Sequence, residues 1–223
     1  MSYIKENIIS LRRQIPDGVK LIAVSKTRLV PEILEAYREG QRLFGENRVQ
    51  ELLSKKDKLP EDIQWHLIGH LQTNKVKYVV PFISMIHSVD TLKLLVTIDS
   101  EAQKINRQVD CLLQFHIASE ETKFGFSLQE VTGMLESAEF RRLTSVKIRG
   151  VMGMATFTKD DSIVRKEFRY LVSCFKALKD KYFHDEGMFS EISMGMSGDY
   201  RIAIEEGSTI IRIGSIIFGN RSI

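Results

Sequence analysis

The sequence predicts a single-domain α/β protein, a closed (β/α)8 TIM-type barrel with one extra helix at the N-terminus. Short β-branched apolar runs alternate with amphipathic segments of helical period, which is typical of parallel strands joined by crossover helices. Eight such runs occur in 223 residues. That length is near the lower size limit of a closed barrel, and an open doubly wound sheet usually needs only about five to seven strands.

The first elements follow in a regular order. Apolar residues at near-helical spacing predict a leading helix over residues 4–15, which the turn residues Pro16-Asp17-Gly18 end. A strand is expected over residues 20–25. A helix over residues 30–38 then closes at Gly40, giving one βα unit.

The same alternation repeats through the rest of the chain. Further strands are expected over residues 42–44, 64–68, 84–89, 110–117, 147–152, 189–194 and 209–213. Helices are expected over residues 47–58, 74–80, 91–106, 128–137, 160–182 and 197–206. No linker-like or low-complexity segment interrupts this order, so we expect one domain over residues 1–223.

The composition excludes several classes of protein. Apolar residues make up 43% of the chain, and only four prolines are present, so the chain is neither disordered nor collagen-like. The net charge of +3 is scattered, which argues against a nucleic-acid partner. No signal peptide or membrane helix is recognisable, and Cys111 and Cys174 are too far apart in sequence for a redox motif. We therefore expect a cytoplasmic protein that binds neither nucleic acid nor membranes.

A lysine stands where the first predicted strand ends. Alternation along the strand places Ile22, Val24 and Lys26 on one side of the sheet. Functional residues of a barrel gather at the C-terminal ends of its strands, so Lys26 is a candidate for chemistry. Its amine would attack a carbonyl compound to form a Schiff base if burial or a nearby cation kept it neutral. The alternative is an ordinary solvated lysine.

Two loops rich in small residues follow the seventh and eighth predicted strands. The first contains Ser197, a candidate helix N-cap beside backbone N–H groups that would bind an anion. The second contains Gly214 and Ser215. These two loops are the usual phosphate site of a (β/α)8 barrel. The alternative for the first loop is a tight turn with a cap and no ligand.

Two more polar residues lie at strand ends. Arg212 interrupts the apolar run of the eighth strand, and an unpaired buried charge is costly. Its partner is therefore either a ligand or a carboxylate in a structural ion pair. Asn47 ends the second strand, and its amide either hydrogen-bonds a ligand or caps the next helix, the cap being the simpler assignment.

The histidines do not predict a metal site. His66 and His70 are four residues apart, but their segment resembles a strand entering a glycine turn, and further ligands are not apparent. His87, His116 and His184 are isolated, so we expect structural or surface roles for them.

Together these residues describe a pocket for a phosphorylated carbonyl compound. A lysine on strand one and phosphate-suited loops after strands seven and eight fit pyridoxal 5'-phosphate (PLP), and they also fit a sugar phosphate. Lys123, after the fifth strand, either adds positive charge to the mouth of this pocket or is a solvated loop lysine.

At these residues the sequence resembles the pyridoxal phosphate homeostasis protein family, also called the YggS or PROSC family. That family is similar to the N-terminal barrel of alanine racemase. The matching stretches run in order from near residue 20 to near residue 220, and as a set they are highly specific. They are Ala23-Val24-Ser25-Lys26-Thr27, Phe44-Gly45-Glu46-Asn47 with Gln50-Glu51, Trp65 to Lys75, Lys123-Phe124-Gly125-Phe126, Ser193-Met194-Gly195-Met196-Ser197, and Arg212-Ile213-Gly214-Ser215 with Ile217-Phe218-Gly219.

The resemblance implies a role for each candidate residue. Lys26 would hold PLP as an internal aldimine, and Arg212 would face the pyridine nitrogen. Asn47 would lie beside the cofactor ring. The phosphate would be held by Ser197, Gly214 and Ser215. No residue is assigned a catalytic or metal-binding role.

The resemblance implies a PLP-binding protein that acts in intracellular vitamin B6 homeostasis without clear turnover. The chain ends about ten residues after the eighth strand, so we expect no second domain of the racemase type. An arginine at the ring nitrogen would also disfavour ring protonation and weaken the ring as an electron sink. We expect a monomer or weak dimer, with PLP-dependent apoenzymes as candidate recipients. The alternatives are a PLP-dependent amino-acid racemase and a Schiff-base aldolase acting on a sugar phosphate.

Overall fold

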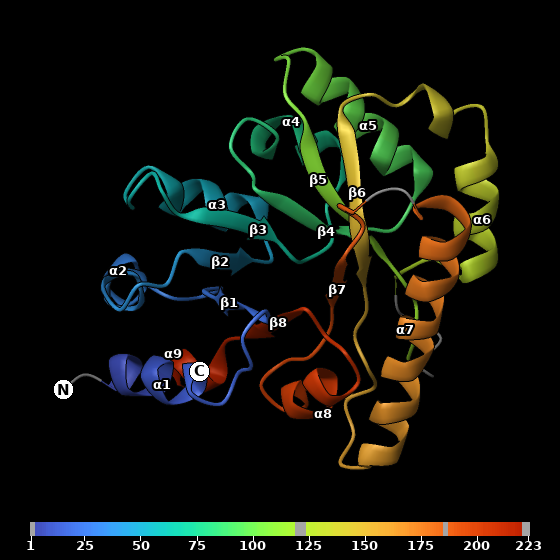
Figure 1. Cartoon of the computed structure of the whole chain (residues 1–223). Coiled ribbons are helices and arrows are strands. Elements are labelled where there is room, and N and C mark those ends of the chain that lie inside the picture. Colours follow the sequence, from blue (N-terminus) through green and yellow to red (C-terminus); the bar gives the residue numbers. More distant parts are fainter. Residues whose placement is uncertain (1–2, 119–123, 185–186, 220–223) are drawn as a thin grey trace.

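The computed structural model describes residues 3–118, 124–184 and 187–219, and its parallel strands close into a barrel (Figure 1). The strands pair in chain order, and β8 pairs back with β1. In the described part of the chain they are β1 (Lys20–Val24), β2 (Leu43–Glu46), β3 (Gln64–Leu67), β4 (Met85–Val89), β5 (Val109–Gln114), β6 (Val146–Met152), β7 (Glu191–Ser193) and β8 (Ile210–Ile213). The predicted (β/α)8 barrel is therefore confirmed.

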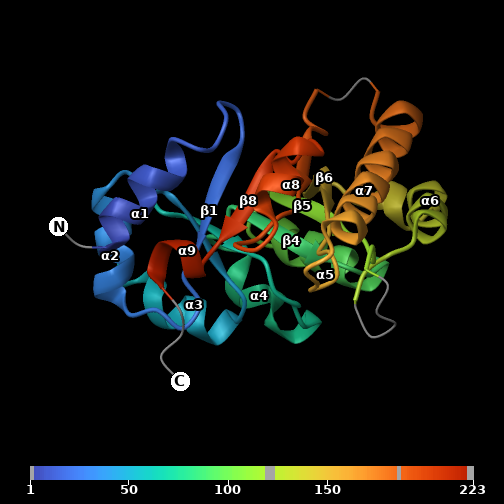
Figure 2. The same cartoon turned by 90° about the horizontal axis from the view of Figure 1, so that it is seen from below.

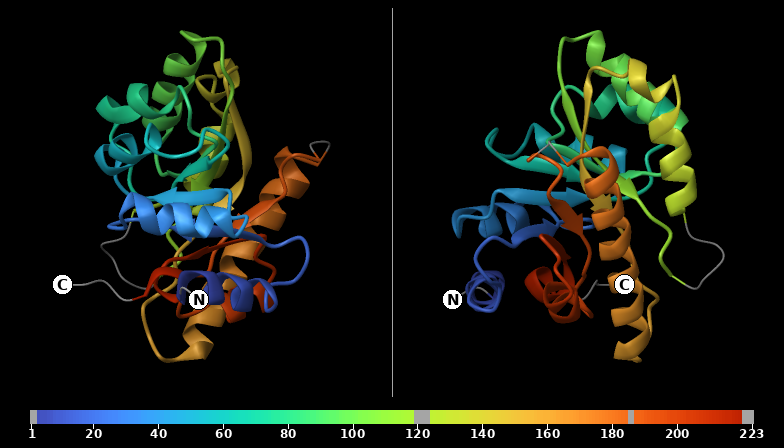
Figure 3. Two further views of the ribbon diagram at one scale, coloured as in Figure 1. Left: turned by 90° about the vertical axis from the view of Figure 1, so that its left-hand side faces the viewer. Right: turned by 45° about the vertical axis from the view of Figure 1, so that its right-hand side comes forward.

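Helices cover the outside of the barrel and connect its strands (Figures 1 and 3). The described α-helices are α1 (Tyr3–Arg12), α2 (Val30–Arg38), α3 (Val49–Lys56), α4 (Val76–Val79), α5 (Leu92–Gln103), α6 (Leu128–Glu136), α7 (Asp161–Tyr182), α8 (Tyr200–Glu205) and α9 (Ser215–Phe218). Two short 3₁₀ turns, η1 (Thr73–Lys75) and η2 (Phe140–Arg142), add to these. No helix in the described ranges is both long and apolar enough to cross a membrane.

The structure corrects several predicted boundaries. The expected helix over residues 197–206 begins only at Tyr200, and the expected strand over residues 189–194 is shortened to β7. The expected helix over residues 74–80 is divided between η1 and α4. Helix α9 is not among the elements that the sequence predicts. Its β-branched pair, Ile216-Ile217, follows an apolar strand directly and gives no helical period of its own.

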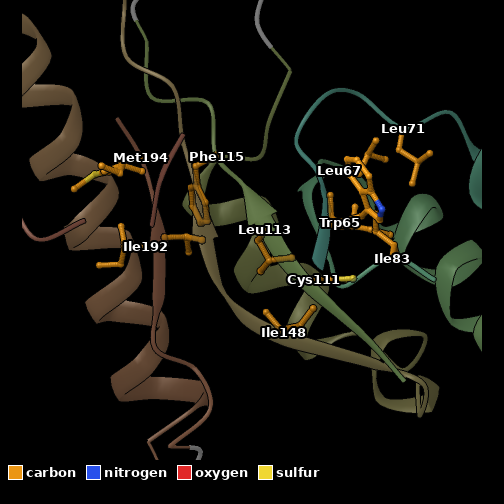
Figure 4. Packing of buried hydrophobic residues seen from close by; sticks show 14 of the residues in the cluster. Trp65, Leu67, Leu71, Ile83, Cys111, Leu113, Phe115, Ile148, Ile192 and Met194 are labelled. Carbon is orange, nitrogen blue, oxygen red and sulfur yellow. The ribbon is translucent and has the colours of Figure 1, made fainter. Parts of the chain in front are cut away.

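Apolar side chains fill two separate layers. The larger cluster lies between the strands and the helices, and Figure 4 shows Leu113, Phe115 and Ile148 in part of it. The smaller cluster is made by Ile22, Met85, Leu112, Met152 and Ile210, which come from five different strands. This second cluster fills part of the barrel interior, as the two-residue alternation of strands requires.

The leading helix α1 packs beside α9, so the start of the described chain lies against its end (Figure 2). The Tyr3 hydroxyl donates to the Phe218 carbonyl at 3.1 Å, and Asn7 Nδ2 donates to the Ile217 carbonyl at 3.1 Å. Both acceptors are among the last carbonyl groups of a helix, which have no partner within the helix itself. The helix α1 therefore supports the segment that follows β8.

Candidate functional site

A cavity of about 830 Å³ opens at the C-terminal ends of the strands. Its volume is in the range of about 300–1,000 Å³ that is usual for small-molecule sites. The structure brings all of the predicted site residues together in its lining, and these are Lys26, Asn47, Ser197, Arg212, Gly214 and Ser215. They follow or belong to β1, β2, β7 and β8, so the site spans the seam at which the barrel closes.

Lys26 lies two residues beyond the end of β1. Val24 lines the cavity together with Lys26, and Ile22 belongs to the interior cluster, in accord with the predicted alternation along this strand. Lys26 is partly buried, and the next residue, Thr27, has a φ of 65°. A β-branched residue in the left-handed region is a conformational outlier, and such outliers gather at functional sites.

The simpler of the two expectations for Asn47, a cap on the next helix, is wrong. The N-cap position of α3 is Arg48, whose side chain makes no capping hydrogen bond. Asn47 instead lines the cavity, and its Oδ1 atom is buried with no hydrogen-bond partner among the described residues. A buried acceptor without a donor is costly, so a ligand that donates a hydrogen bond at this point would satisfy it.

Arg212 projects from β8 into the same cavity and is only 4% exposed. Its Nη1 donates to Ser193 Oγ at 2.5 Å, and its Nη2 donates to the Gly153 carbonyl at 3.0 Å. Burial lowers the pKa of Arg212 to about 10, and the negative charge of Asp199 opposes that shift. In the described ranges no carboxylate forms an ion pair with Arg212, so the structural ion pair considered as its alternative is not present.

A chain of hydrogen bonds extends from Arg212 into the barrel interior. Ser193 Oγ lies 3.0 Å from His87 Nδ1, and His87 Nε2 lies 2.9 Å from His66 Nδ1. Because a guanidinium can only donate, Ser193 Oγ accepts from Arg212, whereas the donor in each of the two contacts made by the histidine rings depends on their tautomers. At the far end of this chain, His66 Nε2 is buried with no partner within the described residues.

This chain was not predicted from the sequence, where His66 is considered only together with His70 and His87 is taken as isolated. Burial is the main cause that lowers the pKa of His66 to about 3, and the charge of Lys20 adds to it. Burial also lowers the pKa of His87 well below its ordinary value, with His66 and Arg212 contributing. The signal was the period-two alternation of β3 and β4, which places both rings on the interior side.

The two small-residue loops form one wall of the cavity. Ser197 is not the N-cap of α8, because that position belongs to Asp199, whose Oδ1 accepts from the Met196 backbone N–H at 2.5 Å. The hydroxyls of Ser197 and Ser215 have no hydrogen-bond partner within the described segments, so both are available to a ligand. A Cβ added to Gly214 would lie 3.3 Å from the Val24 carbonyl oxygen, which is tighter than an ordinary contact, so a larger residue there would require Val24 to shift by a few tenths of an ångström.

The remaining predicted features lie elsewhere. His66 faces the interior, whereas His70 lies 3.1 Å from Asp90 Oδ2 and stacks on the Phe124 ring, so the two histidines do not face a common point. Among the described residues no group of three or more histidine, cysteine or carboxylate side chains could hold a metal ion. Lys123 lies outside the described residues.

The arrangement suits a ligand that combines a carbonyl group with a phosphate. The cavity is lined by the lysine that follows β1, by the hydroxyl and small-residue loops that follow β7 and β8, and by the buried arginine of β8. The amine can condense with a carbonyl, and the hydroxyls and loop backbone can bind phosphate oxygens.

Comparisons with known proteins agree with this geometry. The family model described as the alanine racemase N-terminal domain matches residues 1–222. The pyridoxal phosphate homeostasis protein of Aquifex aeolicus is 40% identical over 205 residues, which cover 91% of this chain and 87% of the relative. The structure of PipY from Synechococcus elongatus without PLP has a TM-score of 0.90 at 37% identity and covers 97% of this chain and 100% of PipY. The PipY structure with PLP bound has a TM-score of 0.87 at 36% identity, with the same coverage.

Proposed function

The chain belongs to the family of the alanine racemase N-terminal domain and the pyridoxal phosphate homeostasis proteins, and from this premise we propose that it binds PLP through Lys26. One observation carries the proposal. The six residues singled out by the sequence line one cavity, and one of them, Asn47, has a buried acceptor atom that finds no partner among the described residues. We assign residues 1–223 to a single PLP-binding domain.

The residues present fit PLP group by group. The buried Oδ1 of Asn47 suits a donor on the ligand ring, and the lack of a side chain at Gly214 lets the backbone after β8 pack closely against Val24 at the edge of the cavity. When bound, PLP supplies an aldehyde that condenses with an amine and releases water. The amine of Lys26 supplies that partner. The phosphate is assigned to Ser197, Gly214 and Ser215.

The guanidinium of Arg212 supports a storage or delivery role over turnover. Its two observed partners, Ser193 Oγ and the Gly153 carbonyl, are neutral acceptors, so its remaining donors can face the ligand. A donor at the pyridine nitrogen favours the unprotonated ring, which is a poor electron sink. We therefore assign the protein to PLP homeostasis in the cytoplasm, as a monomer or weak dimer that hands the cofactor to PLP-dependent apoenzymes.

The test is covalent trapping of added PLP by borohydride, followed by peptide mass analysis. In the native protein we expect a visible absorption band that borohydride removes, and a mass increment on Lys26. Lys26→Ala should show neither. Lys159→Ala removes an exposed lysine from the loop between β6 and α7, so it should behave as the native protein does. Trapping on another lysine, or none at all, would refute the assignment.

A second measurement separates binding from catalysis. The PLP-loaded protein is incubated with L-alanine, and the D-enantiomer is followed with time. We expect no racemisation above the level of Lys26→Ala. Steady racemisation that Lys26→Ala abolishes would show an enzyme of the racemase type. A borohydride-trapped adduct with a sugar phosphate but not with PLP would indicate an aldolase.

A further inference from the structure

We propose that Glu51 and Lys55 of α3 are positioning residues that fix the direction of Lys26 toward the cavity. The proposal rests on the proposed function, since it assigns the means by which the PLP-binding amine is aimed. Neither residue lines the cavity. Both act on Lys26 through its backbone.

The ammonium of Lys55 has three hydrogen-bond donors, and the structure gives each of them a partner. Nζ lies 2.8 Å from the Ser25 carbonyl oxygen, 2.8 Å from Glu46 Oε1 and 2.6 Å from Glu51 Oε1. Ser25 Oγ also donates to Glu46 Oε1 at 2.7 Å. The end of β1 is thereby tied to the end of β2 and to α3.

Glu51 completes the arrangement on the other side of Lys26. Its Oε1 atom accepts from the backbone N–H of Thr27 as well as from Lys55. The Ser25 carbonyl and the Thr27 N–H belong to the two peptide bonds that flank the Cα atom of Lys26. One ion pair on α3 therefore holds the backbone on both sides of the reactive residue.

The burial of this cluster favours a specific role. The side chain of Lys55 is 7% exposed and that of Glu46 is 0% exposed. Burial raises the pKa of Glu46, and the hydrogen bonds from Lys55 and Ser25 oppose that shift. Buried ion pairs contribute little net stability compared with apolar residues, so their presence is better explained by the geometry they impose.

The backbone conformation of Thr27 explains why the chain beside Lys26 needs to be held in place. With φ at 65°, the chain turns sharply just after Lys26 in a conformation that a threonine resists. The hydrogen bond from the Thr27 N–H to Glu51 opposes relaxation of this turn. Loss of the bond should let the turn relax and move the amine of Lys26 away from its working position.

The first readout is the rate at which PLP is trapped on Lys26 by borohydride. We expect Glu51→Ala to lower this rate by about tenfold or more, because small displacements of a reacting group have large kinetic costs. Glu51→Gln keeps an oxygen that can accept from Thr27, so it should recover most of the rate. Lys55 retains Glu46 and Ser25 in both variants, so the cluster keeps its buried charge paired.

Asp99→Ala is the matched control. Asp99 is a buried carboxylate of α5 that accepts from the backbone N–H groups of Thr144 and Ser145, away from the cavity. We expect this variant to lose stability and to trap PLP at the native rate. A trapping rate that falls equally in Asp99→Ala and Glu51→Ala would mean that Glu51 acts only through stability, and would overturn the proposal.

The second readout needs no PLP. Amide hydrogen exchange of the Thr27 N–H in the ligand-free protein should be faster in Glu51→Ala by about fivefold or more, the equivalent of one lost hydrogen bond. Native exchange and native trapping in Glu51→Ala would overturn the inference while leaving the PLP assignment intact. Absence of trapping in the native protein itself would overturn both.

Discussion

At the residue scale, the interior histidines make the stability of the protein depend on pH. Both rings are neutral in the folded state, because burial lowers the pKa of His66 to about 3 and the pKa of His87 well below 6.5. In the unfolded chain each ring takes up a proton near pH 6.5. Unfolding is therefore favoured as the pH falls below that value, by up to about 1.4 kcal/mol per pH unit for each ring.

Urea unfolding of the native protein between about pH 5 and pH 7.5 would test this expectation. The free energy of unfolding should be level above about pH 7 and should decrease below about pH 6.5. His66→Gln removes one of the two protonation sites and should show a shallower decrease. His184→Gln, which changes an exposed histidine, should follow the native curve. Parallel curves for the native protein and His66→Gln would show that the interior rings are not the cause.

At the element scale, the short helix α9 depends on a helix from the other end of the chain. Asn7 of α1 donates to the carbonyl of Ile217, two residues beyond Ser215. We expect Asn7→Ala to loosen α9 and to weaken binding of PLP by about fivefold, the equivalent of one hydrogen bond. Binding of pyridoxal, which lacks the phosphate, should change little, because α9 is assigned to the phosphate side of the cavity.

Equilibrium titrations with PLP and pyridoxal would separate these effects. Ser10→Ala alters an exposed residue of the same helix, so it should leave both affinities unchanged. An equal loss of affinity for PLP and pyridoxal in Asn7→Ala would instead indicate a general loosening of the barrel.

A comparison of the elements shows that the sequence predicts some helix boundaries well, but does not predict helix caps or contacts between strands. Helix α2 begins and ends at the predicted residues, because an amphipathic period is bounded there by Pro31 and by Gly40 with its φ of 83°. The caps of α3 and α8 were misplaced because polar residues at strand ends serve loops and caps alike. The chain from Arg212 to His66 joins residues from four strands. Single-strand patterns do not specify such contacts, which depend on how the closed barrel brings strands together.

At the scale of the whole molecule, a bound ligand would join the first and last strands of the barrel. A ligand present at about 100 times its Kd stabilises the folded state by about 2.7 kcal/mol. For a chain of this size, about 2–4 °C in Tm corresponds to each kcal/mol, so we expect PLP to raise Tm by about 5–10 °C. Thermal unfolding with and without PLP would measure the shift. It should shrink in Lys26→Ala and stay unchanged in Lys159→Ala, and an equal shift in both variants would mean that Lys26 contributes nothing.

The placement of the site at the barrel seam has a consequence for the order in which the protein is made. A ribosome that adds about 5–20 residues per second produces Lys26 roughly 10–40 s before Ser215. During that interval the growing chain carries the amine without the loops assigned to the phosphate, which follow β7 and β8. Firm capture of PLP would then require β8 to have paired with β1, so a nascent chain would gain its cofactor only after translation of the barrel is complete.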